Sequence, residues 1–374
     1  MKHFLTAALT GLALAALPAH ADNVKVGVVQ ALSGPPAIVD FSESYLQGIE
    51  AALEDYKAKT PKHTVELIVY NDEANPQRAV SLAQRLVSND RATLMIGTTN
   101  AASVMALAPL MQQAQTPLLV GPATASDITT RFIDQKPSYV FRCSMVEQYM
   151  TDAVLDWAVK RHKKIGLIHT TSGYGLFALA EVQKGMGKRN AQLAIVESGA
   201  PTVTDLTPQM LKIKSAGVDL LLVYHDSQEL VFRAMQKLDF KPAVAGPWGL
   251  SSAMSERAIG KQAIEGSVMA QALDLADPRA RAFDERMGRK LGEKYRWPLL
   301  AALGYDTMRL ALTAIDNGGA DPAKVRDALE RIDGFVGVSG VPAKPFSSTD
   351  HECLDPQQVF LGVWRDGRVV RLKD

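Results

Sequence analysis

The fold of this chain is decided by the stretch TLMIGTTNAASVMALAPLMQQAQTPLLVGPATASDITT, residues 93–130. Its first four residues are mostly apolar and predict a buried strand, which Gly97 closes. Asn100 can then cap a helix over residues 101–115, because its side chain can accept hydrogen bonds from the first free backbone N–H groups. The stretch therefore begins with a strand, a loop and a helix.

The second half of this stretch starts the same order again. Pro117 ends the helix, residues 118–120 predict the next strand, and Gly121-Pro122 turns the chain. Thr124 and Ser126 can cap a further helix. Parallel strands bring both loops to one carboxyl edge of a sheet, where helix N-termini attract anions. We therefore expect these loops to hold the carboxylate of a small solute, although ordinary strand-to-helix turns would leave the same pattern.

Alternating strands and helices fill most of the remaining chain and predict a doubly wound parallel α/β architecture with two units. The first unit is expected to have strands at residues 24–31, 65–70 and 140–144, and helices at residues 44–58 and from Asn75-Pro76 to about residue 88. The second is expected to have strands at residues 164–169, 193–198, 218–224, 243–246 and 267–271, and helices at residues 151–161, 176–189, 206–215 and 229–238. The last of these strands could return toward the first unit. Helices at residues 279–295, 299–315 and 322–332 and strand-like pieces at residues 336–341 and 359–370 follow.

The N-terminus has the pattern of a secretory signal peptide over residues 1–21. An apolar run at residues 4–17 is too short to span a bilayer, and Ala19-His20-Ala21 is a small-x-small cleavage site. We expect cleavage after Ala21 and export to a periplasm. The mature chain is long enough for two domains. The whole chain has 41 basic and 40 acidic residues, and this balance argues against nucleic acid or an anionic membrane as a partner.

The two cysteines and the histidines give no sign of a metal centre. Cys143 and Cys353 could form a disulfide in an oxidising compartment, or remain two separate buried thiols. The 7 histidines are scattered. No nucleophile elbow, phosphate-binding loop or zinc-protease motif occurs in the sequence. We therefore expect no catalytic residues, no metal and no cofactor.

Several motifs, in this order, are similar to those of the periplasmic leucine/isoleucine/valine-type binding proteins of ABC importers. They are VKVGVVQALSGPPA, IGTTNAAS, PLLVGPATASDIT, the S-x-Y-G of residues 172–175, LGYDTMRLALTAI and FSSTDHECLDP with VWRDGRVV. The resemblance spans nearly the whole mature chain. It implies a type I periplasmic binding protein fold, with two α/β lobes joined by crossings near residues 141–145, 269–272 and 344–347. Lobe 1 would comprise residues 22–142 plus 272–344, and lobe 2 residues 143–271 plus 345–374.

The resemblance also implies which residues bind the ligand. The hydroxyl that holds the α-carboxylate in amino-acid binders of the family is replaced here by Ala101, which leaves Asn100 and backbone N–H groups. The residues implied in the two loops of lobe 1 are Asn100, Ala101, Ala102, Ala123, Thr124 and Ala125. Lobe 2 would contribute Tyr174, Asp226 and Trp248.

Trp248 stands where the family has the acid that pairs with the ligand ammonium. An ammonium without an acid would lose about 3–5 kcal/mol, and cation–π attraction to Trp248 recovers only about 2 kcal/mol. Either Asp226 replaces the acid, or the ligand has no ammonium. Each residue also has a structural alternative: Asn100 and Asp226 could be caps, and Trp248 could cover the lobe edge. Phe41 and Tyr45 could line the pocket, although Tyr45 could face the core.

The function implied is solute capture for an inner-membrane ABC permease. The ligand would be a small carboxylate with an apolar or aromatic body, such as an amino acid, a keto acid or an aromatic acid. The two lobes of a monomer would close around it. The alternative is a receptor whose closed form is read by a sensor or regulatory protein.

Overall fold

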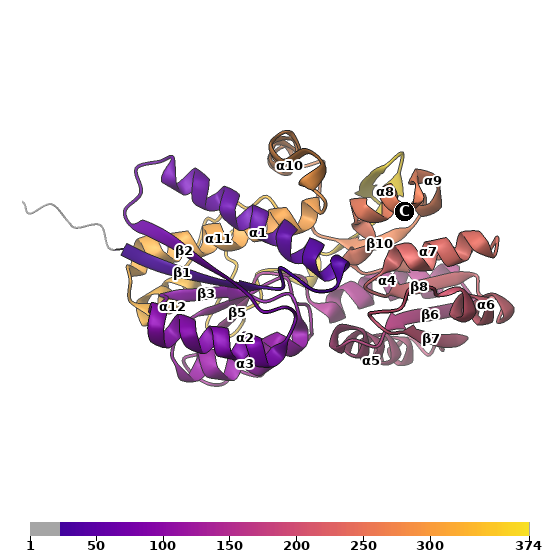
Figure 1. Cartoon of the computed structure of the whole chain (residues 1–374), viewed down its shortest axis with the longest axis horizontal. Helices are drawn as coiled ribbons and strands as arrows, with labels where there is room; N and C mark the ends of the chain where they lie inside the picture. Colours follow the sequence, from indigo (N-terminus) through magenta and orange to yellow (C-terminus); the bar gives the residue numbers. More distant parts are fainter. Residues whose placement is uncertain (1–22, 374) are drawn as a thin grey trace, which may run out of the picture.

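The computed structural model describes residues 23–373, which form two α/β lobes lying side by side (Figure 1). The expected signal peptide and its cleavage site lie outside the described residues. The type I fold predicted from the sequence is confirmed.

The first lobe is built on a five-stranded sheet with the order β2-β1-β3-β4-β5. All neighbouring strands are parallel. The strands are β1 (Asn23–Gln30), β2 (Thr64–Asn71), β3 (Leu94–Gly97), β4 (Leu118–Val120) and β5 (Val140–Arg142). β1 has an apolar run at residues 26–29 and is buried on both faces from Val26 to Gln30, as expected for a central parallel strand.

The second lobe is built on a seven-stranded sheet with the order β12-β11-β10-β9-β8-β6-β7. Its strands are β6 (Ile165–Thr170), β7 (Ile195–Gly199), β8 (Leu220–Tyr224), β9 (Ala243–Gly246), β10 (Val268–Gln271), β11 (Phe360–Arg365) and β12 (Arg368–Arg371). β6–β10 are parallel, and the hairpin β11–β12 is antiparallel. β10 therefore belongs to the second sheet, and the chain returns toward the first lobe directly after it.

Helices cover both sheets (Figure 1). They are α1 (Pro36–Lys57), α2 (Pro76–Arg85), α3 (Ala101–Gln113), α4 (Glu147–Arg161), α5 (Gly173–Lys188), α6 (Thr207–Ser215), α7 (Gln228–Lys237), α8 (Ala253–Ile259), α9 (Lys261–Ile264), α10 (Pro278–Leu291), α11 (Pro298–Gly318) and α12 (Pro322–Glu330). α1 and α11 pack closely against each other on the first lobe. A Cβ on Gly304 would lie 2.0 Å from the carbonyl oxygen of Tyr45, so only glycine permits this approach.

Two predicted elements were wrong, and in each case a side chain accepts a hydrogen bond from a backbone N–H of another segment. Residues 336–341 form no strand, since the N–H groups of Val338 and Ser339 both donate to the buried carboxylate of Asp306. No regular helix follows β4, because the Ser126 hydroxyl accepts the N–H of Gln148 at the start of α4 instead of capping its own segment. Only the first of the two loops is therefore a helix N-terminus.

The chain passes between the lobes after β5, after β10, and between α12 and β11. These positions support the division that we propose, with residues 22–142 plus 272–344 in one lobe and residues 143–271 plus 345–374 in the other. The first and third crossings run beside each other. The N–H of Arg142 donates to the carbonyl of His351, and the N–H of Cys353 donates to the carbonyl of Arg142, both at 2.9 Å.

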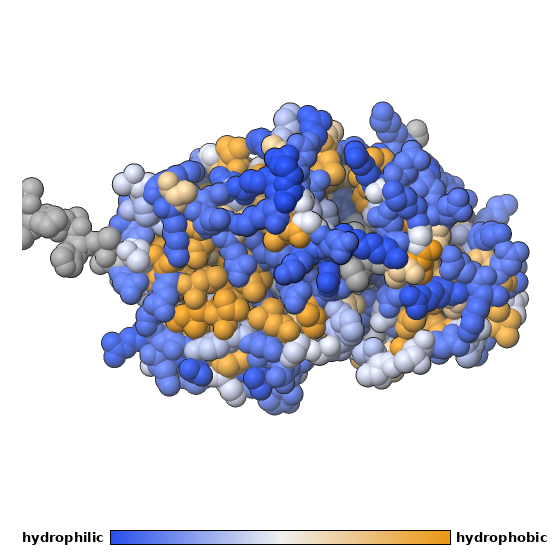
Figure 2. Space-filling model, turned by 45° about the horizontal axis from the view of Figure 1, so that its top comes forward, coloured by the Kyte–Doolittle hydropathy of each residue, from blue (hydrophilic) through white to orange (hydrophobic). Residues whose placement is uncertain are grey.

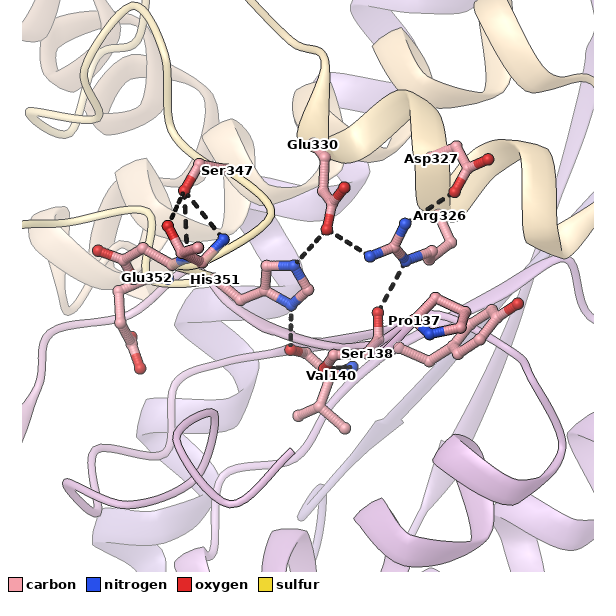
Figure 3. Close-up of polar contacts among 12 residues, drawn as sticks. Pro137, Ser138, Val140, Arg326, Asp327, Glu330, Ser347, His351 and Glu352 are labelled. Atoms are coloured by element: carbon pink, nitrogen blue, oxygen red, sulfur yellow. Dashed lines mark hydrogen bonds and ion pairs between the residues drawn. The ribbon is translucent and has the colours of Figure 1, made fainter. Parts of the chain in front are cut away.

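Side chains hold the third crossing to the first lobe (Figure 3). His351 Nδ1 lies 2.9 Å from the carbonyl oxygen of Val140, and its Nε2 lies 3.0 Å from Oε1 of Glu330 on α12. Arg326 pairs with the same Glu330 carboxylate and donates to the carbonyl of Ser138 at 2.9 Å. This network fixes the segment that leads into the second lobe.

Cys143 and Cys353 form a disulfide between the two adjacent crossings, 210 residues apart in sequence. A covalent link over so long a loop restricts the unfolded chain strongly. We predict that replacing both cysteines with serine lowers the free energy of unfolding by about 2–4 kcal/mol. Urea denaturation under non-reducing conditions measures this. A double variant as stable as the oxidised protein would contradict the prediction, and reduced wild type should resemble the variant.

Hydrophilic side chains cover most of the face in Figure 2, and apolar side chains show between them chiefly on the first lobe. Within the described residues, no helix combines the length and the apolar character needed to cross a membrane.

Candidate functional site

A cavity lies between the carboxyl edges of the two sheets. The empty space there is about 640 Å³, part of it open to solvent. Its lining comes from both lobes: Ile38, Phe41, Thr99, Asn100, Ala101, Pro122, Ala123 and Thr124 from the first, and Ser172, Tyr174, His225, Asp226, Gln228, Trp248 and Gly249 from the second.

The N-terminus of α3 forms one wall of the cavity. The Asn100 carboxamide oxygen accepts the N–H of Ala102 at 2.8 Å and that of Ser103 at 3.4 Å, so the predicted cap is present. The N–H of Ala101, also in the first turn of α3, makes no hydrogen bond to the Asn100 side chain. Gly97 precedes this loop with a φ of 149°, and a Cβ there would lie 2.2 Å from the Val29 carbonyl oxygen.

Gln30, at the end of β1, joins the two loops of the first lobe. Its Nε2 donates to the carbonyl of Gly121 at 2.9 Å, and its Oε1 accepts the Thr99 hydroxyl at 2.6 Å. Thr98 donates to the buried carboxylate of Asp72 at 2.6 Å. The wall of the cavity is therefore fixed by hydrogen bonds before any ligand enters.

The second loop presents Thr124 to the cavity. Its hydroxyl donates to Oε2 of Glu147 at 2.7 Å, and its carbonyl accepts the backbone N–H of Glu147 at 2.8 Å. Glu147 is 1 % exposed and does not line the cavity itself.

The second lobe contributes a polar cluster around Asp226. The Ser172 hydroxyl caps α5 by accepting the N–H of Gly175, and it donates to Oδ2 of Asp226 at 3.2 Å. Burial raises the pKa of Asp226, while hydrogen bonds from Thr170 and Ser172 act in the opposite direction. Burial also raises the pKa of Tyr174 well above its usual value.

His225 and Gln228 flank this acid. Burial lowers the pKa of His225 to about 4, so its imidazole is neutral near neutral pH. Its Nδ1 accepts the N–H of Ser227 at 3.1 Å, which leaves the ring proton on Nε2. The carboxamide oxygen of Gln228 is buried and has no hydrogen-bond partner among the described residues.

Aromatic side chains from both lobes meet beside the cavity. The ring of Phe41 lies 5.3 Å from that of Trp248 and 4.6 Å from that of Trp297, in edge-on arrangements that favour attraction. Trp248 and Trp297 are 5.6 Å apart. The start of α5 also approaches α3, since a Cβ on Gly173 would lie 3.4 Å from the Ala102 Cβ. The lobes are therefore close together in this structure.

The structure brings seven of the nine predicted site residues to one cavity, namely Asn100, Ala101, Ala123, Thr124, Tyr174, Asp226 and Trp248. Ala102 and Ala125 do not line it. The N–H of Ala102 is occupied by the Asn100 cap, and the carbonyl of Ala125 accepts from the Arg142 guanidinium at 2.6 Å. Tyr45 faces the core, where its hydroxyl bonds Thr307.

Sequence reasoning did not select several lining residues. Ser172 stands in the S-x-Y-G motif with Tyr174, and Gln228 lies two positions after Asp226. Their closeness in sequence to predicted site residues could have identified both. The other lining residues that the binding-site prediction omitted are Ile38, Phe41, Thr99, Pro122, His225 and Gly249, of which Phe41 had been considered as a pocket residue.

The charge of the lining limits what it can hold. Asp226 is the one acidic residue of the lining, and no lysine or arginine is among the lining residues. An anion would therefore be bound by N–H and hydroxyl groups rather than by a cation. Among the described residues, no group of three or more histidine, cysteine, aspartate or glutamate side chains could hold a metal ion.

Comparison with known proteins gives a family match over almost the whole described chain. The family model described as "Periplasmic binding protein" matches residues 23–368. The Leu/Ile/Val-binding protein homolog 6 of Brucella abortus (strain 2308) is 28 % identical over 378 residues, covering 96 % of this chain and 92 % of the relative.

Solved structures share the fold at low sequence identity. A branched-chain amino acid transporter substrate binding protein from Streptococcus pneumoniae, in complex with isoleucine, has a TM-score of 0.80 at 16 % identity and covers 94 % of this chain and 100 % of its own. An ABC transporter solute binding protein from R. palustris, in complex with 4-hydroxybenzoate, has a TM-score of 0.78 at 22 % identity and covers 94 % and 96 %.

Proposed function

The chain belongs to the periplasmic binding protein family, in its leucine/isoleucine/valine type, and we propose that it captures a small carboxylate in the periplasm for an inner-membrane ABC permease. The observation that carries this proposal is the cavity, which takes lining residues from both lobes. A ligand that contacts both walls favours the closed form only through contacts it makes there. The closed monomer would then dock on the permease.

The ligand carboxylate would bind the first lobe. The Ala101 N–H at the positive end of the α3 dipole and the Thr124 hydroxyl are the groups there that suit an anion. The absence of a cation from the lining agrees with a ligand of one negative charge. Backbone N–H groups and hydroxyls can hold such a charge at moderate cost.

The body of the ligand would be apolar or aromatic. Ile38, Phe41, Tyr174 and Trp248 supply aliphatic and aromatic surface to the cavity. The two structural neighbours support this range, because one is in complex with isoleucine and the other with 4-hydroxybenzoate. An aliphatic or aromatic acid suits the site better than an amino acid, since Trp248 stands where the family has its ammonium-binding acid.

Calorimetry with leucine, 4-methyl-2-oxopentanoate and 4-hydroxybenzoate tests the proposal. We expect at least one of the two acids without an ammonium to bind with micromolar affinity or better, about −8 kcal/mol. The matched control is 4-hydroxybenzamide, which keeps the ring and loses the charge. Equal binding of 4-hydroxybenzoate and its amide would contradict a carboxylate site. Tight binding of leucine with no binding of either acid would contradict the preference for a ligand without an ammonium.

The loss of affinity on replacing Asp226 with asparagine shows whether a hydroxyl or an ammonium of the ligand faces this carboxylate. A ligand hydroxyl that donates to this carboxylate would lose about 1.5 kcal/mol, or about tenfold in Kd. A ligand ammonium would lose at least about 3 kcal/mol, or more than about 100-fold, because the ammonium would stay buried without a partner. We expect the smaller loss, measured by calorimetry with 4-hydroxybenzoate. Asp205, an exposed residue outside the cavity, gives the control variant Asp205→Asn.

A further inference from the structure

Glu147 lies directly behind the cavity wall at the first crossing between the lobes. It is the first residue of α4, and its side chain and backbone both bind Thr124, at 2.7 Å and 2.8 Å. Thr124 in turn lines the cavity. Thr124 alone therefore separates the buried carboxyl group of Glu147 from the proposed subsite for the ligand carboxylate.

The surroundings of Glu147 leave it weakly compensated. Its second oxygen, Oε1, is buried and has no hydrogen-bond partner among the described residues. The ionisable groups that interact with it are Arg142 at the end of β5, Tyr174 and Glu181 on α5, and Tyr224 on β8. Arg142 already pairs with Glu352. Burial is the largest effect and raises the pKa of Glu147 to about 7.

The Thr124 hydroxyl has a single proton to donate. When Glu147 is ionised, that proton goes to its carboxylate, and Thr124 can offer only lone pairs to the cavity. When Glu147 is protonated, its O–H can donate to Thr124 Oγ1, and the threonine proton is free to point toward the cavity. Only the second arrangement gives a ligand carboxylate a hydrogen bond instead of a repulsive contact.

We propose that Glu147 is a positioning residue whose protonation turns the Thr124 hydroxyl toward the ligand carboxylate, so that the protein takes up a proton together with its anion. This inference rests on the carboxylate ligand proposed above. The proton comes from solvent and goes to the Glu147 side chain. A bound anion also favours protonation of Glu147, because two negative charges close together repel each other.

The sign of the pH dependence follows directly. Binding should be tightest where Glu147 is protonated in the free protein, and it should weaken as the pH rises above about 7. From about pH 6 to about pH 8.5, we expect Kd to rise about 20-fold to 30-fold. Calorimetry with 4-hydroxybenzoate, in two buffers of different ionisation enthalpy at about pH 8, should report uptake of about one proton per ligand. If 4-methyl-2-oxopentanoate or leucine binds more tightly, the same titrations use that probe.

Glu147→Gln is the decisive variant. Its carboxamide can donate to Thr124 Oγ1 at every pH, as the protonated acid does. We expect it to bind the probe with the wild-type affinity of about pH 6 and to keep that affinity up to about pH 8.5. Glu181→Gln is the matched control, since it removes a neighbouring charge without touching Thr124, and it should keep the wild-type slope.

The outcomes separate the two proposals. A wild-type Kd that does not change with pH, or a Glu147→Gln variant with the wild-type slope, would overturn this inference and leave the binding function standing. No binding of any of the three carboxylates would overturn both. The free protein gives an independent measurement: the melting temperature of wild type relative to Glu147→Gln should fall as pH rises from about 4.5 to about 7, because the folded-state pKa is raised. Equal melting profiles would also overturn the inference.

Discussion

Replacing Arg142 with methionine is expected to lower the free energy of unfolding by about 3–5 kcal/mol, since it leaves a buried carboxylate without its cation. The Arg142 side chain is 0 % exposed and that of Glu352 is 6 % exposed. Two nitrogens of the guanidinium donate to the two oxygens of Glu352, both at 2.6 Å, and the third donates to the carbonyl of Ala125. The substitution therefore removes three hydrogen bonds from a site that water does not reach.

A matched control separates this pair from ordinary surface charge. Arg131 makes a similar contact with Asp127 at 2.5 Å, but both side chains are about half exposed. Exposed pairs contribute about 0–1 kcal/mol, so Arg131→Met should leave stability nearly unchanged. Urea denaturation of both variants at neutral pH measures the difference. Equal effects of the two substitutions would show that the buried pair does not hold the crossings together.

The Arg142–Glu352 pair also shows where sequence reasoning stops. The alternation of strands and helices predicted both sheets, because local periodicity is visible in one segment at a time. Nothing local links residue 142 with residue 352, since the pairing exists only after two crossings lie side by side. The same holds for Cys143 and Cys353. The sequence allowed either a disulfide or two separate thiols, and in the structure the two cysteines form a disulfide.

The cavity was predictable where its residues come from strand ends. Asn100, Thr124, Asp226 and Trp248 each follow a parallel strand, and the carboxyl edge of a sheet is a general ligand site. Ile38 was missed for a different reason. The helix was expected to start at residue 44, but α1 starts at Pro36, because the proline ring already has a helical φ and lacks the N–H that a first turn cannot use.

The early start of α1 determines the first wall of the cavity. Ile38 and Phe41 are three residues apart and thus share one helix face, which the structure turns to the cavity. The sequence Ser33-Gly34-Pro35-Pro36 is typical of a turn, so it gives no sign that a helix begins there and that Ile38 and Phe41 share its face. The prediction for residues 336–341 failed in a similar way, since the buried Asp306 takes backbone N–H groups that an apolar run would offer to a neighbouring strand.

Removing the Trp248 ring is the substitution from which we expect the largest loss of ligand affinity. Trp248 lines the cavity from the second lobe and contacts Phe41 and Trp297 of the first. Trp248→Ala removes ligand surface and also the aromatic contacts that hold the lobes together when closed. Loss of a buried aromatic ring and its edge-on partners corresponds to about 2–4 kcal/mol, or about 30-fold to 1,000-fold in Kd.

Two further variants separate the contribution of closure from that of direct contact. Trp297 is not among the residues that line the cavity, so Trp297→Ala weakens binding only if the aromatic cluster favours the closed form. We expect a loss of about tenfold, from about 1–1.5 kcal/mol of ring–ring attraction. Trp157, which lies on α4 beside Arg161 and outside the cavity, provides the control variant Trp157→Ala with unchanged Kd. If Trp248→Ala bound 4-hydroxybenzoate as tightly as Trp157→Ala does, neither ligand contact nor lobe closure would depend on this ring.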